Sequence, residues 1–148
     1  MSWSKDVYKR AAVKHYKNCQ YIFDLIPTIH NAEYKTHVFS DCYYVGGYVL
    51  ECALKFFIMN KLHLSKAYSK TELESYRLLT HNLHHLWQIA TEGSDPLSLE
   101  WKNLDNKTKQ WSEEVRYERS CNYNVIESDL VSFRSDLETV YNIVFNQF

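Results

Sequence analysis

Apolar side chains recur along this chain at intervals of three to four residues, the spacing that lines one face of an α-helix. Five such stripes are visible, at residues 8–26, 38–59, 83–90, 97–115 and 130–144. No segment has the pattern of a β-strand, and only three Gly and two Pro are available for turns. The pattern predicts an all-α protein, an antiparallel bundle of four main helices and a shorter one.

The first two stripes differ in the residues that flank them. Four cations lie beside the first stripe and predict an amphipathic helix with a basic outer side: Lys9, Arg10, Lys14 and Lys17. The second stripe is apolar on nearly every side and contains the pair Gly46-Gly47. Because glycine inside a helix costs about 1 kcal/mol relative to alanine, we expect another helix backbone or a second copy of the chain to approach closely there.

Turn residues indicate where the later helices begin and end. Thr80 is expected to cap the third helix, which ends at Gly93. Asp95 and Pro96 then fit the N-cap and first-turn positions of the next helix. We see no domain boundary, so residues 1–148 are predicted to form a single domain.

Charge is distributed unevenly along the chain, although the formal net charge is only -1. Residues 1–70 contain ten Lys/Arg and five Asp/Glu, whereas residues 71–148 contain seven and thirteen. This asymmetry is typical of a protein with an anionic partner on one face. It is equally typical of a self-associating pair, or of ordinary solvated helix faces, which is the interpretation we favour.

Cysteine usage and hydropathy indicate a cytoplasmic protein. The four cysteines have no short paired spacing: Cys19, Cys42, Cys52 and Cys121. Neither a disulfide framework nor a secretory leader is therefore expected. Glu51 and Lys55 interrupt the most apolar segment, so we expect no membrane partner.

Three groups of motifs, in their order along residues 38–145, resemble the HEPN domain family of small helical bundles. They are Gly47-Tyr48 with Leu50-Glu51 and Leu54-Lys55, then Thr80-His81-Asn82-Leu83, then Trp111 and Arg116-Tyr117. The resemblance implies a HEPN-like bundle, usually a homodimer, of a kind frequent in toxin–antitoxin and antiviral-defence operons. It also implies a cognate antitoxin or nucleotidyltransferase as a partner, and no cofactor.

Many HEPN proteins are metal-independent endoribonucleases whose active motif pairs an arginine with a histidine a few residues later. The arginine holds the scissile phosphate, and the imidazole moves protons at the ribose and at the leaving oxygen. Arg116 resembles the arginine of this motif, but no histidine follows His85 and Asn122 stands at the corresponding distance. An amide cannot shuttle a proton at neutral pH, so the usual mechanism is predicted to be absent or severely weakened.

Glu51 lies in the apolar second stripe, where a carboxylate needs a cationic or hydrogen-bonding partner. Arg116 is the candidate partner. In one interpretation the pair is structural and ties the second helix to the segment before the last helix, with Tyr117 packed beside it. In the other interpretation Arg116 binds phosphate and Glu51 sets its orientation. We favour the structural interpretation because the histidine is missing.

Three neighbouring histidines open the third helix: His81, His84 and His85. Their spacing is also that of helical zinc ligands. No cysteine or carboxylate repeats the pattern nearby, so capping or packing is the interpretation we favour, and no metal is predicted.

Two segments mix basic and aromatic residues in a way that suits single-stranded RNA, although plain helices can have the same composition. One contains Trp3, Lys5, Lys9, Arg10, Lys14 and Lys17, and the other Lys61, His63, Lys66, Tyr68 and Lys70. The sequence therefore predicts a catalytically degenerate HEPN module that binds RNA or a partner protein. The binding residues singled out are Glu51, Tyr117, Arg119, Lys9, Arg10 and Lys14. The alternative is an endoribonuclease in which Arg116 and Asn122 act with an atypical proton shuttle.

Overall fold

The computed structural model describes residues 2–93 and 127–146, and all regular structure in these ranges is helical. The elements are α1 (Lys5–Leu25), a short 3-10 helix η1 (Ile26–Thr28), α2 (Ala32–Lys61), α3 (Lys70–Ser75), α4 (Leu83–Ala90) and α5 (Glu127–Asn146). The all-α prediction is confirmed. The helix predicted at residues 97–115 lies outside the described residues.

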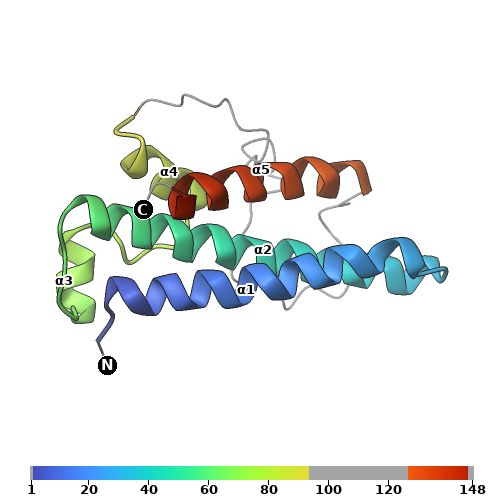
Figure 1. Cartoon of the computed structure of the whole chain (residues 1–148), viewed down its shortest axis with the longest axis horizontal. Coiled ribbons are helices and arrows are strands. Elements are labelled where there is room, and N and C mark those ends of the chain that lie inside the picture. The colour runs from blue at the N-terminus through green and yellow to red at the C-terminus, as the bar shows by residue number, and fades with distance from the viewer. Residues whose placement is uncertain (1, 94–126, 147–148) are drawn as a thin grey trace.

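The helices α1 and α2 form a long antiparallel hairpin (Figure 1). Pro27 lies in η1 and stops α1, because proline has no backbone N–H to continue the helix. The Asn31 side chain then accepts a hydrogen bond from Tyr34 N and caps the start of α2. Lys5 Nζ donates to Asn60 Oδ1 at 3.0 Å, which holds the start of α1 against the end of α2.

Helix α5 packs along α2, to which it runs parallel. It contacts α1, to which it runs antiparallel, through side chains (Figure 1). The ring of Tyr43 meets that of Phe133, and Phe56 further along α2 meets Phe145 further along α5. The antiparallel prediction therefore holds for the neighbours α1 and α2. The second and the last helix run parallel, as they do in an antiparallel bundle with one more main helix between them, and the helix predicted there lies outside the described residues. Parallel neighbours need a long connection, and residues 62–126 supply one between these two helices.

Gly46 lies on the side of α2 that faces α5. A Cβ atom at this position would lie 2.5 Å from Phe133 Cε1 and 3.2 Å from Leu137 Cδ1. Both side chains are almost completely buried. The nearest atoms to this position therefore belong to side chains of α5 and not to the helix backbone that we expected; the approach of a second copy stays a prediction.

Helix α2 is the centre of the core. It is long and apolar enough to cross a membrane by length and composition alone, yet 78% of its most apolar window is buried inside the structure. Its fully enclosed side chains include Tyr43, Val49, Leu50, Leu54 and Met59. The apolar side chains of α2 are thus covered by α1, α4 and α5, as in the core helix of a helical bundle.

The cap of α4 differs from the predicted one. The Asn82 side chain accepts a hydrogen bond from His85 N at 3.0 Å and is the N-cap. Thr80 lies two residues before this cap, and its Oγ1 accepts a hydrogen bond from Asn82 N at 3.1 Å. Thr80 therefore shapes the loop that leads into α4, and the amide two residues later caps the helix because it reaches the first free N–H groups. The helix ends at Ala90, before Gly93.

Candidate functional site

Glu51 is buried inside the bundle, as its position in the apolar stripe predicted. It is only 4% exposed, and its Oε1 lies 2.8 Å from Nζ of Lys55, which is equally buried. The two residues are one helical turn apart on α2, the spacing at which side chains of opposite charge meet. The Lys55 ammonium also lies 5.5 Å from the centre of the Tyr8 ring on α1. Glu51 and Lys55 therefore neutralise each other within the core.

His81 is the second partner of Glu51. Its Nδ1 lies 2.9 Å from Glu51 Oε2, so both carboxylate oxygens are engaged. The imidazole is 47% exposed and lies in the loop just before α4. The contact therefore ties the start of α4 to the middle of α2, with one end in the core and the other at the surface.

The i,i+4 spacing of Glu51 and Lys55 is a signal that could have identified this pair from the sequence. No local pattern indicated His81, because its contact joins a loop to a helix thirty residues away in the chain. Of the three histidines, His81 thus binds a carboxylate. No group of three potential metal ligands occurs in residues 2–93 and 127–146.

The outer face of α1 is strongly basic. Four of its cations are exposed to solvent: Lys9, Arg10, Lys14 and Lys17. Together with Val13 and Asn18 they line a shallow depression on the surface of the helix. Within the described part of the chain, no carboxylate pairs with Arg10, Lys14 or Lys17. The Lys9 ammonium lies 5.8 Å from the centre of the Phe56 ring, so this face carries positive charge that the fold leaves unneutralised.

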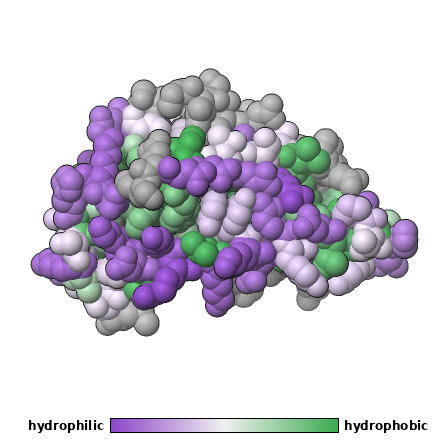
Figure 2. Space-filling view, in the orientation of Figure 1, coloured by the Kyte–Doolittle hydropathy of each residue, from purple (hydrophilic) through white to green (hydrophobic). Residues whose placement is uncertain are grey.

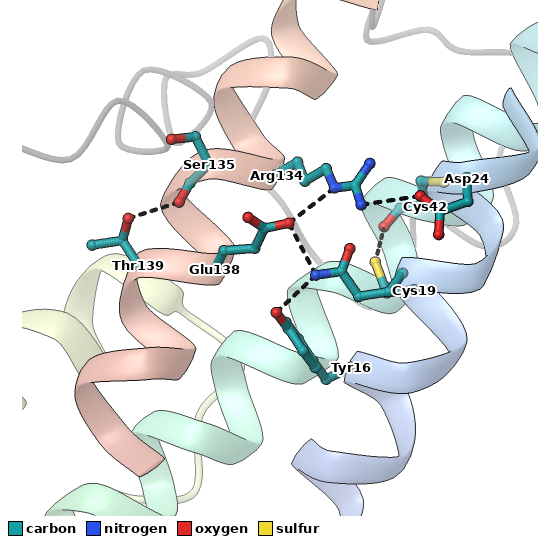
Figure 3. A network of polar contacts seen from close by, with 9 residues as sticks. Tyr16, Cys19, Asp24, Cys42, Arg134, Ser135, Glu138 and Thr139 are labelled. Atoms are coloured by element: carbon teal, nitrogen blue, oxygen red, sulfur yellow. Dashed lines mark hydrogen bonds and ion pairs between the residues drawn. The ribbon is translucent and has the colours of Figure 1, made fainter. Parts of the chain in front are cut away.

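A polar seam joins α1 to α5, and nothing in the sequence pattern indicated it (Figure 3). Arg134 Nε donates to Glu138 Oε1 at 2.9 Å, and its Nη2 donates to Asp24 Oδ1 at 3.2 Å. Gln20 Nε2 donates to the same Glu138 oxygen at 2.9 Å and to the Tyr16 hydroxyl at 2.7 Å. Because two carboxylates already surround Arg134, this guanidinium serves the packing of α5 on α1 and offers little charge to a ligand.

The thiols of α1 and α2 are enclosed and unreactive. Cys19, Cys42 and Cys52 are all free and buried. Burial raises the pKa of Cys19 and of Cys52 to about 12, and it raises the pKa of Cys42 as well. Since the thiolate is the reactive form, these residues are packing groups of the core.

The remaining predicted site residues lie outside the described ranges: Arg116, Tyr117, Arg119 and Asn122. The predicted pairing of Glu51 with Arg116 therefore stays a prediction. Comparison with known proteins finds no match to a family model, to a curated protein or to a solved structure.

Proposed function

We propose that this protein is a HEPN-type helical module that binds RNA through the basic face of α1. The observation that carries the proposal is the set of exposed cations on α1 that lack carboxylate partners in the described part of the chain. Surface lysines and arginines without partners contribute little to folding. A polyanion is the ligand class that such a face fits.

The spacing of these cations suits a phosphate backbone. Lys9 and Lys17 are eight residues apart, which is about 12 Å along a helix. Arg10 and Lys14 lie between them on the same side, so several phosphates of one strand could be contacted together. Arg10 adds a planar donor fork that matches phosphate oxygens.

Binding without catalysis is the activity that the residues favour. Arg116 is present, but the histidine that would move protons in the HEPN mechanism is not. Glu51, which was considered as the group that orients Arg116, is enclosed with Lys55. A cognate antitoxin or nucleotidyltransferase and a homodimeric state belong to the same proposal, because the resemblance to HEPN proteins implies them.

The test is fluorescence anisotropy with a labelled single-stranded RNA at several salt concentrations. A variant carrying Lys9→Glu, Arg10→Glu and Lys14→Glu should bind much more weakly than the natural chain. For single strands, each phosphate contact adds about 0.7 to the steepness of the decrease of log K with log salt concentration. Losing the three contacts should therefore make this dependence less steep by about 2. A matched variant with Lys9→Arg, Arg10→Lys and Lys14→Arg keeps the charge and should keep most of the affinity.

Two results would contradict the proposal. An unchanged affinity and salt slope in the charge-reversal variant would remove the α1 face as the binding surface. Cleavage of RNA in EDTA that Arg116→Ala abolishes would instead identify an endoribonuclease. Light scattering of the natural chain tests the dimer, and a monomer-sized species alone at micromolar concentration would exclude it.

A further inference from the structure

Backbone pairing joins the N-terminal segment to the connection between α2 and α3. The Trp3 N–H donates to the Tyr68 carbonyl oxygen at 2.8 Å, and the Tyr68 N–H donates to the Trp3 carbonyl oxygen at 2.7 Å. These segments are the two in which basic and aromatic residues alternate, far apart in the sequence. The fold places them side by side at the end of the hairpin where α3 lies (Figure 1).

An aromatic ring is held at the surface of this end. Tyr68 is buried, and its ring meets that of Tyr76 at 6.0 Å and nearly at a right angle. Tyr76 itself is 39% exposed. Because the buried ring supports the exposed one, Tyr76 is positioned to present a flat apolar surface to a ligand.

Two exposed cations lie at the two ends of α3. Lys61 and Lys66 already pair with Glu92 and Glu72. Lys70 is the first residue of α3 and Arg77 follows its C-cap; both are exposed, and within residues 2–93 and 127–146 neither pairs with a carboxylate. The cations that this end offers to a ligand are therefore Lys70 and Arg77, with the exposed Glu74 between them on the same helix.

The backbone at Arg77 has the left-handed conformation that often ends a helix. Arg77 has φ of 60° and follows Tyr76, the C-cap of α3. His63 and Glu92 have φ of 57° and 56° directly after the C-caps of α2 and α4, so this conformation is how α2, α3 and α4 all end. At α3 it places the Arg77 side chain directly after the exposed ring.

We propose that Tyr76, Lys70 and Arg77 form a second nucleotide subsite that continues the basic face of α1. An unpaired base stacks on Tyr76, and the adjoining phosphate contacts Arg77 and Lys70. Hydrophilic residues predominate over the first half of α1 and over α3, with small apolar patches among them (Figure 2). The inference rests on RNA binding by α1 and adds that the strand is unpaired where it leaves that helix, because a stacked base in a duplex cannot reach a protein ring.

The experiment compares two single-stranded RNAs, of about 4 and about 12 nucleotides, in the range of known single-strand site sizes. Tyr76→Ala should weaken binding of the longer strand by about 5-fold to 150-fold, because stacking on an aromatic side chain is worth about 1–3 kcal/mol per base. Binding of the shorter strand, which α1 alone can hold, should change by less than about 2-fold. A hairpin duplex of the longer sequence should bind the natural chain and the Tyr76→Ala variant equally.

Two further variants make the test specific. Tyr34→Ala removes a ring that is 59% exposed at the opposite end of the hairpin, and it should leave binding of both strands unchanged. Arg77→Asn removes the charge and keeps a residue that tolerates positive φ, so it tests the subsite without strain. It should lower the salt slope for the longer strand by about 0.7.

The outcomes separate this inference from the proposal on which it rests. If Tyr76→Ala and Arg77→Asn bind the longer strand like the natural chain while charge reversal on α1 weakens both strands, the subsite is refuted and RNA binding by α1 stands. Equal losses for Tyr34→Ala and Tyr76→Ala would also refute the subsite. If the natural chain binds neither strand, both proposals fail.

Discussion

Removing one member of the Glu51–Lys55 pair should destabilise the protein strongly. The two side chains are in contact at 2.8 Å and are 5% and 4% exposed. Glu51→Leu would leave the Lys55 ammonium buried without a counter-ion, and Lys55→Met would leave the Glu51 carboxylate with only the half-exposed His81. Breaking a buried pair in this way costs about 3–5 kcal/mol.

Replacing both members should have a very different effect. The pair gives up its hydration when the chain folds, so its net contribution to stability is small compared with the loss on breaking it. The variant with both Glu51→Leu and Lys55→Met should therefore be as stable as the natural chain, or more stable by about 1–4 kcal/mol. The double variant also loses the contact of Glu51 with His81, which costs only about 0–1 kcal/mol because the imidazole is half exposed.

Urea unfolding followed by circular dichroism measures these differences. With a denaturant slope of about 1–3 kcal/mol/M for a small protein, each single variant should lower the urea midpoint by about 2 M. The double variant should recover it, which gives a large coupling energy in the double-mutant cycle. Additive effects, with each single change costing under about 1 kcal/mol, would refute the conclusion that the pair is buried and mutually dependent.

The same double variant distinguishes the two interpretations of Glu51. If the carboxylate has a structural role, the refolded double variant should bind RNA with the affinity of the natural chain. A stable double variant that has lost RNA binding would show that Glu51 contributes to the site itself.

Three other predictions concern the core. Gly46→Ala should lower the free energy of unfolding by about 1–2 kcal/mol, because overpacking against Phe133 outweighs the gain in helix propensity. Adding Phe133→Leu to this variant should recover part of the lost stability. A raised urea midpoint for Gly46→Ala alone would contradict the close packing at this position. In a Cys121→Ser background, the three buried thiols should react with a thiol reagent at about pH 8 only after urea unfolding, and rapid labelling of the folded protein would disprove their enclosure. Burial raises the pKa of Tyr8 from 10.0 to about 12, so the folded state keeps this proton longer than the unfolded state; the corresponding stability is complete below pH 10 and is lost as the pH rises to about 12. Tyr8→Phe should flatten that part of a stability-against-pH curve, and an unchanged slope would count against the shift.

The predicted helices were located well where local signals are strong. The stripe at residues 38–59 corresponds to α2, which extends to Ala32 because Asn31 supplies a cap that the apolar pattern does not include. The stripe at residues 8–26 corresponds to α1 and the start of η1, where Pro27 ends the helix. The cap of α4 was misplaced because Thr80 and Asn82 are both competent capping residues, and the sequence does not rank them.

The candidate site was only partly predictable. The exposed cations of α1 follow from the helical period alone, since the side opposite a buried stripe faces solvent. The need of Glu51 for a partner also followed from its apolar surroundings. Its two partners in the described ranges were not identified from the sequence. Lys55 lies one turn away on the same helix and could have been found from that spacing, whereas His81 comes from a distant loop that no local pattern indicates.

By itself, the sequence determined which segments are helical, which of their faces are apolar and which are charged, because these properties depend on residues three to five positions apart. Only the tertiary structure decided that α5 runs parallel to α2, that Phe133 occupies the space beside Gly46 and that His81 contacts Glu51. It also decided that the segment of Trp3 pairs with that of Tyr68. Each of these contacts joins residues far apart in the chain, and their geometry is set by how whole helices pack, a choice that no local spacing encodes.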